Sequence, residues 1–143
     1  MTIPLWMLLG FAAWTVLLLL ATVGWYRWSR ILTGRVAIRD FRADQVEGED
    51  WYRRSMRAHA NCLENLPVFG AIVFVMYATG VGGPAVNYLS ISILVARVAQ
   101  SLVHVCLVQT NTVAALRFTF FLFQLVSFLA LIVIVVRHAG PAS

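Results

Sequence analysis

The sequence predicts an all-α integral membrane protein, a bundle of four membrane-spanning helices that forms one domain. Hydrophobic residues make up 61% of the 143 residues and only 12% are charged, whereas a soluble domain is about half apolar and about a quarter charged. Four apolar stretches divide the chain, and each provides the roughly 20 residues that a spanning helix needs. Composition and segment length together indicate a bilayer environment.

Short polar or glycine-rich segments separate the expected spans. The spans cover residues 4–26, 52–79, 85–108 and 115–136 of a single domain that runs from residue 1 to residue 143. The run from Gly80 to Pro84 carries the turn residues that end the second span. Residues 1–26 carry no charged side chain. We therefore expect the first span to be a membrane helix and not a cleaved signal peptide, which begins with basic residues.

Arginine supplies all eleven basic residues, and eight of these lie between Arg27 and Arg57. The cluster occupies a polar loop, about residues 30–50, and its flanks. Basic loops of membrane proteins face the cytoplasm. We therefore expect a multi-pass protein of a bacterial inner membrane, with this loop cytoplasmic and both termini on the opposite side. The clustering beside membrane spans also argues against nucleic-acid binding.

Polar side chains inside the predicted spans follow helical spacing. In the second span, Arg57, Asn61 and Glu64 are separated by four and three residues, which places them on one face. In the third span, Arg97 and His104 are seven residues apart and share a face for the same reason. An ionisable side chain at mid-membrane costs about 2.5–3.5 kcal/mol, so each one indicates a specific role.

The charges of these intramembrane groups do not balance. Arg57, Arg97 and Arg117, which opens the fourth span, stand against Glu64 and leave a net charge of +2. Because buried charges are normally paired, the excess predicts an external anion. A ligand with carboxylates fits guanidinium groups, and Asn61 and Glu64 remain for an amide or ammonium. Alternatively, the arginines near helix ends snorkel to headgroups and Glu64 pairs between helices. Spacing alone leaves both readings open.

The run from Arg57 to Pro67 resembles the signature of the MAPEG superfamily, membrane-associated proteins in eicosanoid and glutathione metabolism. Its pattern is Arg, three residues, Asn, two residues, Glu, two residues, Pro. The four spans, the polar first loop and the arginines of the third and fourth spans extend this similarity over nearly the whole chain. The resemblance implies a homotrimer of the microsomal glutathione transferase type, with glutathione held between subunits near the cytoplasmic side.

The resemblance also implies residue roles. Glutathione-binding positions are Arg57, Asn61, Glu64, Arg97 and His104. His104 stands where the characterised enzymes commonly carry a tyrosine, so its hydrogen-bonding group differs. Arg117 resembles the catalytic arginine that stabilises the glutathione thiolate, because a cation near sulfur increases the population of the nucleophilic form. The implied activity is glutathione transferase or peroxidase chemistry on lipophilic electrophiles or hydroperoxides.

Two other functions stay open at the level of sequence. A non-catalytic protein could bind a lipid or a protein partner in the same cleft. A small four-helix transporter could use Glu64 as a proton-coupled carboxylate. Small exporters, however, place that carboxylate in the first span, and three intramembrane arginines would repel cationic substrates. Arg27 or Arg30 is a further candidate contact from the first span.

The sulfur and imidazole groups are scattered along the chain. Cys62 and Cys106 lie in separate apolar segments, so we expect two small core residues and no disulfide or redox pair. His59, His104 and His138 also lie in separate segments and lack the paired spacing of metal ligands. We therefore expect no metal site.

Overall fold

The structure is a computed structural model that describes residues 1–42 and 46–139. Its elements are α1 (Ile3–Leu18), the π-helical segment η1 (Leu19–Gly24), α2 (Trp25–Leu32), the short 3-10 helix η2 (Ile38–Asp40), α3 (Asp50–Thr79), α4 (Pro84–Cys106) and α5 (Asn111–Ala139). The first three elements form one continuous helical rod, Ile3–Leu32. This rod and α3, α4 and α5 are each long and apolar enough to cross a membrane. The prediction of an all-α protein with four spans is confirmed.

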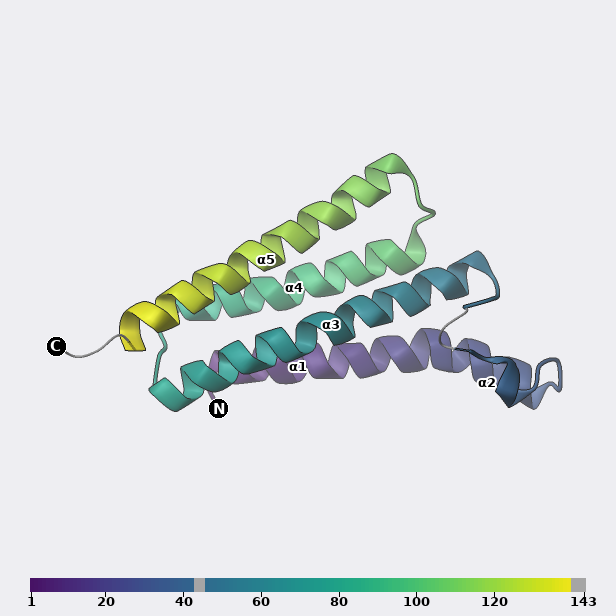
Figure 1. Cartoon of the computed structure of the whole chain (residues 1–143), viewed down its shortest axis with the longest axis horizontal. Coiled ribbons are helices and arrows are strands. Elements are labelled where there is room, and N and C mark those ends of the chain that lie inside the picture. The colour runs from purple at the N-terminus through teal and green to yellow at the C-terminus, as the bar shows by residue number, and fades with distance from the viewer. Residues whose placement is uncertain (43–45, 140–143) are drawn as a thin grey trace.

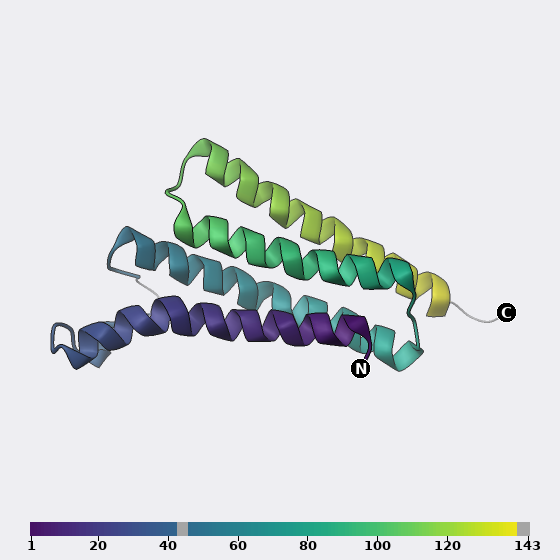
Figure 2. The ribbon, with the colours of Figure 1, turned by 180° about the vertical axis from the view of Figure 1, so that it is seen from behind.

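The four long helices alternate in direction along a common axis (Figure 1). The N-terminus, the end of α5 and the turn at residues 80–83 lie at one end of the bundle. The first loop and the linker at residues 107–110 lie at the other end, the loop end. In both views α4 and α5 diverge toward the loop end (Figures 1 and 2). This divergence sets the position of the candidate site described below.

The first rod is longer than the predicted span, which was expected to end at residue 26. It continues to Leu32 because tertiary contacts stabilise its arginine-containing last turns. The rings of Tyr26 and Tyr52 stack with centroids 4.1 Å apart. Arg27 Nε donates a hydrogen bond of 2.8 Å to Tyr52 Oη. The start of α3 therefore extends the first helix beyond the apolar residues that the sequence pattern detects.

Two helix ends follow local backbone and capping rules. α3 ends at Gly80, whose φ of +68° favours glycine, and the Val81 N–H donates to the Met76 carbonyl at 3.0 Å. α5 begins four residues earlier than the predicted residue 115. The hydroxyl of Thr110 accepts a hydrogen bond from the Val113 N–H at 3.2 Å and so caps the first turn.

The core is a continuous apolar seam along the rods. Phe69 of α3 is fully buried between Phe11 of α1 and Phe128 of α5, with ring centroids 6.0 Å away on each side. α1 and α4 approach closely at Gly10, where an added Cβ would lie 2.9 Å from Leu94 Cδ2. Because lipid tails are as apolar as the core, close van der Waals packing of this kind holds membrane helices together.

The two cysteines differ in environment. Cys62 is fully buried, as expected, and its Sγ lies 3.5 Å from Ser101 Oγ. Cys106 is exposed, so the prediction that it is a core residue is wrong. It is the last residue of α4, at the end where α5 has moved away from α4. The sequence shows only a cysteine in an apolar segment, and this does not reveal that the packing between α4 and α5 ends at Cys106.

We predict that Phe69→Ala lowers the free energy of unfolding by about 3–5 kcal/mol, because it empties the space between two other rings. Thermal or denaturant unfolding of the purified protein in detergent measures the effect. Phe74→Ala is the matched control, since Phe74 lies on the same helix but is 69% exposed. Equal losses for the two variants would contradict the assignment of Phe69 to the core.

Candidate functional site

Three polar residues of α3 form a stripe that faces out of the bundle. Arg57 and Glu64 are exposed and Asn61 is half-buried, and we call these three residues the outward stripe. Glu64 lies at the middle of the 30-residue helix, which is about 45 Å long. A hydrocarbon layer about 30 Å thick therefore surrounds it. Within the described residues Glu64 forms no ion pair, and it interacts electrostatically with the buried Arg97 of α4.

The polar face of α4 points into the bundle instead. Arg97 and His104 are 1% and 2% exposed, and Ser101 between them contacts Cys62 of α3. The guanidinium of Arg97 lies over the Phe11 ring, 5.6 Å from its centroid. Arg97 Nε and Nη2 and His104 Nε2 are buried without a hydrogen-bond partner among the described residues. Such groups are costly to bury, so α4 supplies interior polar atoms that lack hydrogen-bond partners in this chain.

Two glutamines connect α4 to α5 near this face. Gln124 Nε2 donates to Gln100 Oε1 at 3.1 Å and to the Phe120 carbonyl at 3.0 Å. Gln100 Nε2 donates in turn to the backbone carbonyl of Arg117 at 3.0 Å. Both amides are buried. Hydrogen bonds between membrane helices contribute about 0.6–2 kcal/mol each, and this chain of bonds fixes the backbone of Arg117 relative to α4.

A groove of about 310 Å³ is lined by residues of α3, of α4 and α5 and of the linker between them. Its linker residue belongs to the loop end, the end at which α4 and α5 diverge in Figure 2. We call this groove the polar groove; its lining residues are Asn61, Gln100, Gln109, Ala114, Arg117, Phe118 and Phe121. Arg117 is half-buried, and its Nε has no hydrogen-bond partner among the described residues. A volume near 300 Å³ is at the lower end of small-molecule sites. The groove therefore presents a guanidinium donor and three amides to a small polar ligand.

The fold brings some of the predicted site residues together and separates others. Asn61 belongs to both the outward stripe and the polar groove, so these two features are continuous. Arg117, far away in sequence, shares the groove with it. Arg97 and His104 lie behind this surface and do not line the groove. The candidate site thus has an outer part that a ligand can reach and an inner cationic part.

Of the residues that line the polar groove, the sequence predicted only Asn61 and Arg117 as site residues. Gln109 lies just past the predicted third span, residues 85–108, yet it contributes to the groove wall. Helical periodicity ends with α4 and cannot orient a linker side chain. The sequence did contain an indication for Gln100, because a side-chain amide inside an apolar span needs a hydrogen-bond partner.

The two arginines of the first rod point in different directions. Arg27 lies against the start of α3, where its Nη2 is 3.8 Å from Met56 Sδ. Arg30 pairs with Glu49 at the end of the first loop, at a distance of 2.5 Å. Neither residue lines the polar groove. Of the two, Arg27 is the one directed at the helix that carries the outward stripe.

The chain was compared with known families, curated proteins and solved structures. The sequence model of the MAPEG family matches residues 3–137, which include all residues of the outward stripe and the polar groove. No curated protein and no solved structure gave a significant match. With nearly its whole length covered by the family model, the chain belongs to the MAPEG family.

Proposed function

We propose that this chain binds glutathione at the loop end of the bundle and uses its thiolate to attack lipophilic electrophiles or hydroperoxides. The observation that carries the proposal is the polar groove, in which Arg117 and Asn61 meet beside the outward stripe. Glutathione has two carboxylates, one ammonium group, two amide bonds and one thiol. Its groups match the charges and amides of this site. The MAPEG family includes glutathione transferases and peroxidases, which supports the proposal.

The residues of the outward stripe bind the charged groups at the ends of glutathione. Arg57 binds a carboxylate through its planar guanidinium, and Glu64 binds the ammonium group. Asn61 lies between them and binds the peptide amides. Arg97 and His104 contribute from the interior, where the fixed positive charge of Arg97 strengthens the binding of an anion. The ligand supplies the negative charge that this part of the chain lacks.

Arg117 acts on the thiol. A guanidinium close to sulfur stabilises the thiolate, which is the nucleophile. In a transferase reaction the sulfur forms a bond to an electrophilic carbon, and the leaving group departs with its bonding electrons. In a peroxidase reaction the sulfur attacks the terminal oxygen of a hydroperoxide and forms the S–O bond of a sulfenic acid. The O–O bond breaks, an alcohol leaves after protonation, and a second glutathione reduces the sulfenic acid to give a disulfide and water.

The lipophilic substrate has a place beside this site. A groove of about 420 Å³ runs between α4 and α5 and is lined by Ile91, Ser92, Val95, Ala96, Thr119, Phe120 and Phe123. These residues begin within one helical turn of Gln100 and Arg117. A substrate dissolved in the bilayer can therefore approach the polar groove along an apolar path without crossing water.

The proposed assembly is a homotrimer with glutathione between subunits, the first loop cytoplasmic and both termini on the opposite side. The position of Glu64 supports it, because an unpaired carboxylate facing lipid at mid-membrane costs about 2.5–3.5 kcal/mol. A neighbouring subunit that covers the outward stripe removes this contact with lipid. Native mass spectrometry of the detergent-solubilised protein is expected to give a trimer. A monomer that binds glutathione would contradict the inter-subunit site.

We predict that Glu64→Gln and Arg57→Ala each weaken glutathione binding about tenfold or more, since each loses one charge-assisted interaction of about 1.5–3 kcal/mol. Isothermal titration calorimetry measures the affinity. Glu47→Gln and Arg39→Ala are matched controls, because they remove the same charges from exposed positions of the first loop. Unchanged affinity in both stripe variants would contradict the assigned recognition.

We predict that Arg117→Ala reduces the ultraviolet thiolate absorbance of bound glutathione about tenfold while glutathione affinity changes less. A cation within about 4 Å is worth about 1–4 kcal/mol at effective dielectric constants between 80 and 20. Arg137→Ala is the control, because it removes an exposed arginine from the opposite end of the same helix. If the wild-type protein binds glutathione but gives no thiolate signal, the chain is a binding protein and not an enzyme.

A further inference from the structure

A second polar groove lies on the other side of the loop end, away from the proposed glutathione site. Its volume is about 490 Å³, and we call it the membrane-boundary groove. Its lining includes Ala21, Trp25, Ser29, Arg30, Arg35 and Glu49. None of these residues belongs to the outward stripe or the polar groove. The proposed glutathione chemistry therefore leaves this groove without a role.

The lining of the groove changes in polarity along the first rod. Ala21, Trp25, Ser29 and Thr33 all line it and are spaced four residues apart, which places them on one helix face. Over this distance of about 18 Å the side chains change from apolar, through an indole, to hydroxyls. Each interfacial layer of a bilayer is only about 5–8 Å thick. The groove therefore reaches from the headgroup region into the hydrocarbon, as a site for an amphiphile must.

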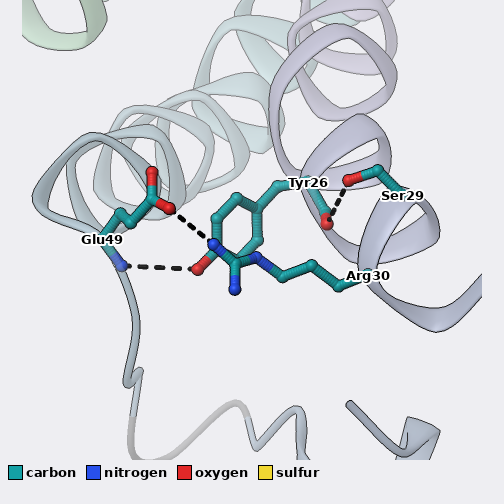
Figure 3. Close-up of polar contacts among 4 residues, drawn as sticks. All are labelled: Tyr26, Ser29, Arg30 and Glu49. Atoms are coloured by element: carbon teal, nitrogen blue, oxygen red, sulfur yellow. Dashed lines mark hydrogen bonds and ion pairs between the residues drawn. The ribbon is translucent and has the colours of Figure 1, made fainter. Parts of the chain in front are cut away.

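The polar end of the groove is held in place by aromatic and ionic contacts (Figure 3). The guanidinium of Arg30 lies over the Tyr26 ring, 4.4 Å from its centroid, and its Nη2 is 2.5 Å from Glu49 Oε1. Tyr26 Oη accepts a hydrogen bond from the Glu49 N–H at 3.4 Å. The Arg30 side chain is 28% exposed. Glu49 engages one nitrogen of the fork, so the other donors remain available to an anion.

The guanidinium groups are the charged donors that this groove offers. Ser29 Oγ donates its hydrogen to the Tyr26 carbonyl at 3.0 Å, and Thr33 Oγ1 donates to the Ser29 carbonyl at 2.7 Å. The Arg35 side chain is exposed and has no ion-pair partner within the described ranges. Two arginines and one glutamate line the groove, which leaves a net charge of +1. One phosphodiester group carries the single negative charge that balances it.

We propose that the membrane-boundary groove binds an anionic phospholipid. Its phosphate lies between Arg30 and Arg35, and its glycerol and first methylenes lie along Trp25 and Ala21. Guanidinium binds phosphate in a bidentate geometry. Trp25 is 72% exposed and sits at the depth where indole rings favour the interface. A zwitterionic lipid brings no net charge and leaves the excess of +1 in place. This inference stands independently of glutathione binding.

The test is native mass spectrometry of the full-length, detergent-solubilised protein titrated with phosphatidylglycerol, with phosphatidylethanolamine of the same acyl chains, and with inorganic phosphate. Phosphatidylglycerol is expected to bind more tightly than phosphatidylethanolamine. Arg30→Gln combined with Arg35→Gln is expected to weaken phosphatidylglycerol binding about tenfold or more, the effect of losing charge-assisted hydrogen bonds. Arg39→Gln combined with Arg53→Gln is the matched control, because it removes two exposed arginines outside the groove.

The outcomes separate the alternatives. Equal weakening in the groove variant and the control would show general attraction to a basic loop, and would overturn the proposal. Competition by inorganic phosphate at the same site would identify a free-anion site and would also overturn it. Because Arg30 packs on Tyr26, its loss can disturb the fold. The single variant Arg35→Gln avoids this problem, because Arg35 is exposed. If that variant bound phosphatidylglycerol with wild-type affinity, the assigned role of Arg35 would be contradicted.

Discussion

The rule that polar groups inside a bilayer must find partners governs the rest of this structure. Most hydroxyl groups in the rods satisfy it locally. Thr15, Thr22 and Ser90 each donate to the carbonyl four residues earlier, at 2.9, 2.6 and 2.8 Å. These bonds need no neighbouring helix, so they leave the packing of the core unconstrained. A polar side chain that cannot form such a local hydrogen bond points to a further contact, because its partner must come from another helix, another molecule or water.

The glutamine pair shows how the rule also shapes the site. Gln100 and Gln124 satisfy each other across α4 and α5, and the remaining amide donor of Gln100 reaches the backbone of Arg117. The bonds join α4 to α5 through side chains on their facing sides. They hold the first turns of α5 at a fixed distance while leaving the polar groove open. The hydrogen bonds that satisfy the buried amides of Gln100 and Gln124 thus also position the guanidinium of Arg117 in the groove that Asn61 of α3 lines.

Sequence periodicity predicted which residues share a helix face, but not which way each face points. Arg57 and Glu64 share a face that is exposed, whereas Arg97 and His104 share a face that is buried. The spacing is the same in both helices, and only the packing of the rods decides between the two environments. The number and approximate bounds of the spans depend on local apolar runs, so they were predictable. The extension of the first rod to Leu32, the groove position of Gln109 and the exposure of Cys106 depend on tertiary contacts, so they were not.

The junction between the first rod and α3 sets the depth of the outward stripe. Trp51 and Tyr52 lie beside Tyr26, at 6.4 and 4.1 Å between ring centroids, and clustered aromatic rings of this kind are typical of the membrane boundary. Glu64 follows Tyr52 by twelve residues, or about 18 Å along the helix. The middle of a hydrocarbon layer is about 15 Å below its boundary. Since a carboxylate side chain is too short to reach the headgroups from that depth, Glu64 must be covered by protein or by a bound cationic group.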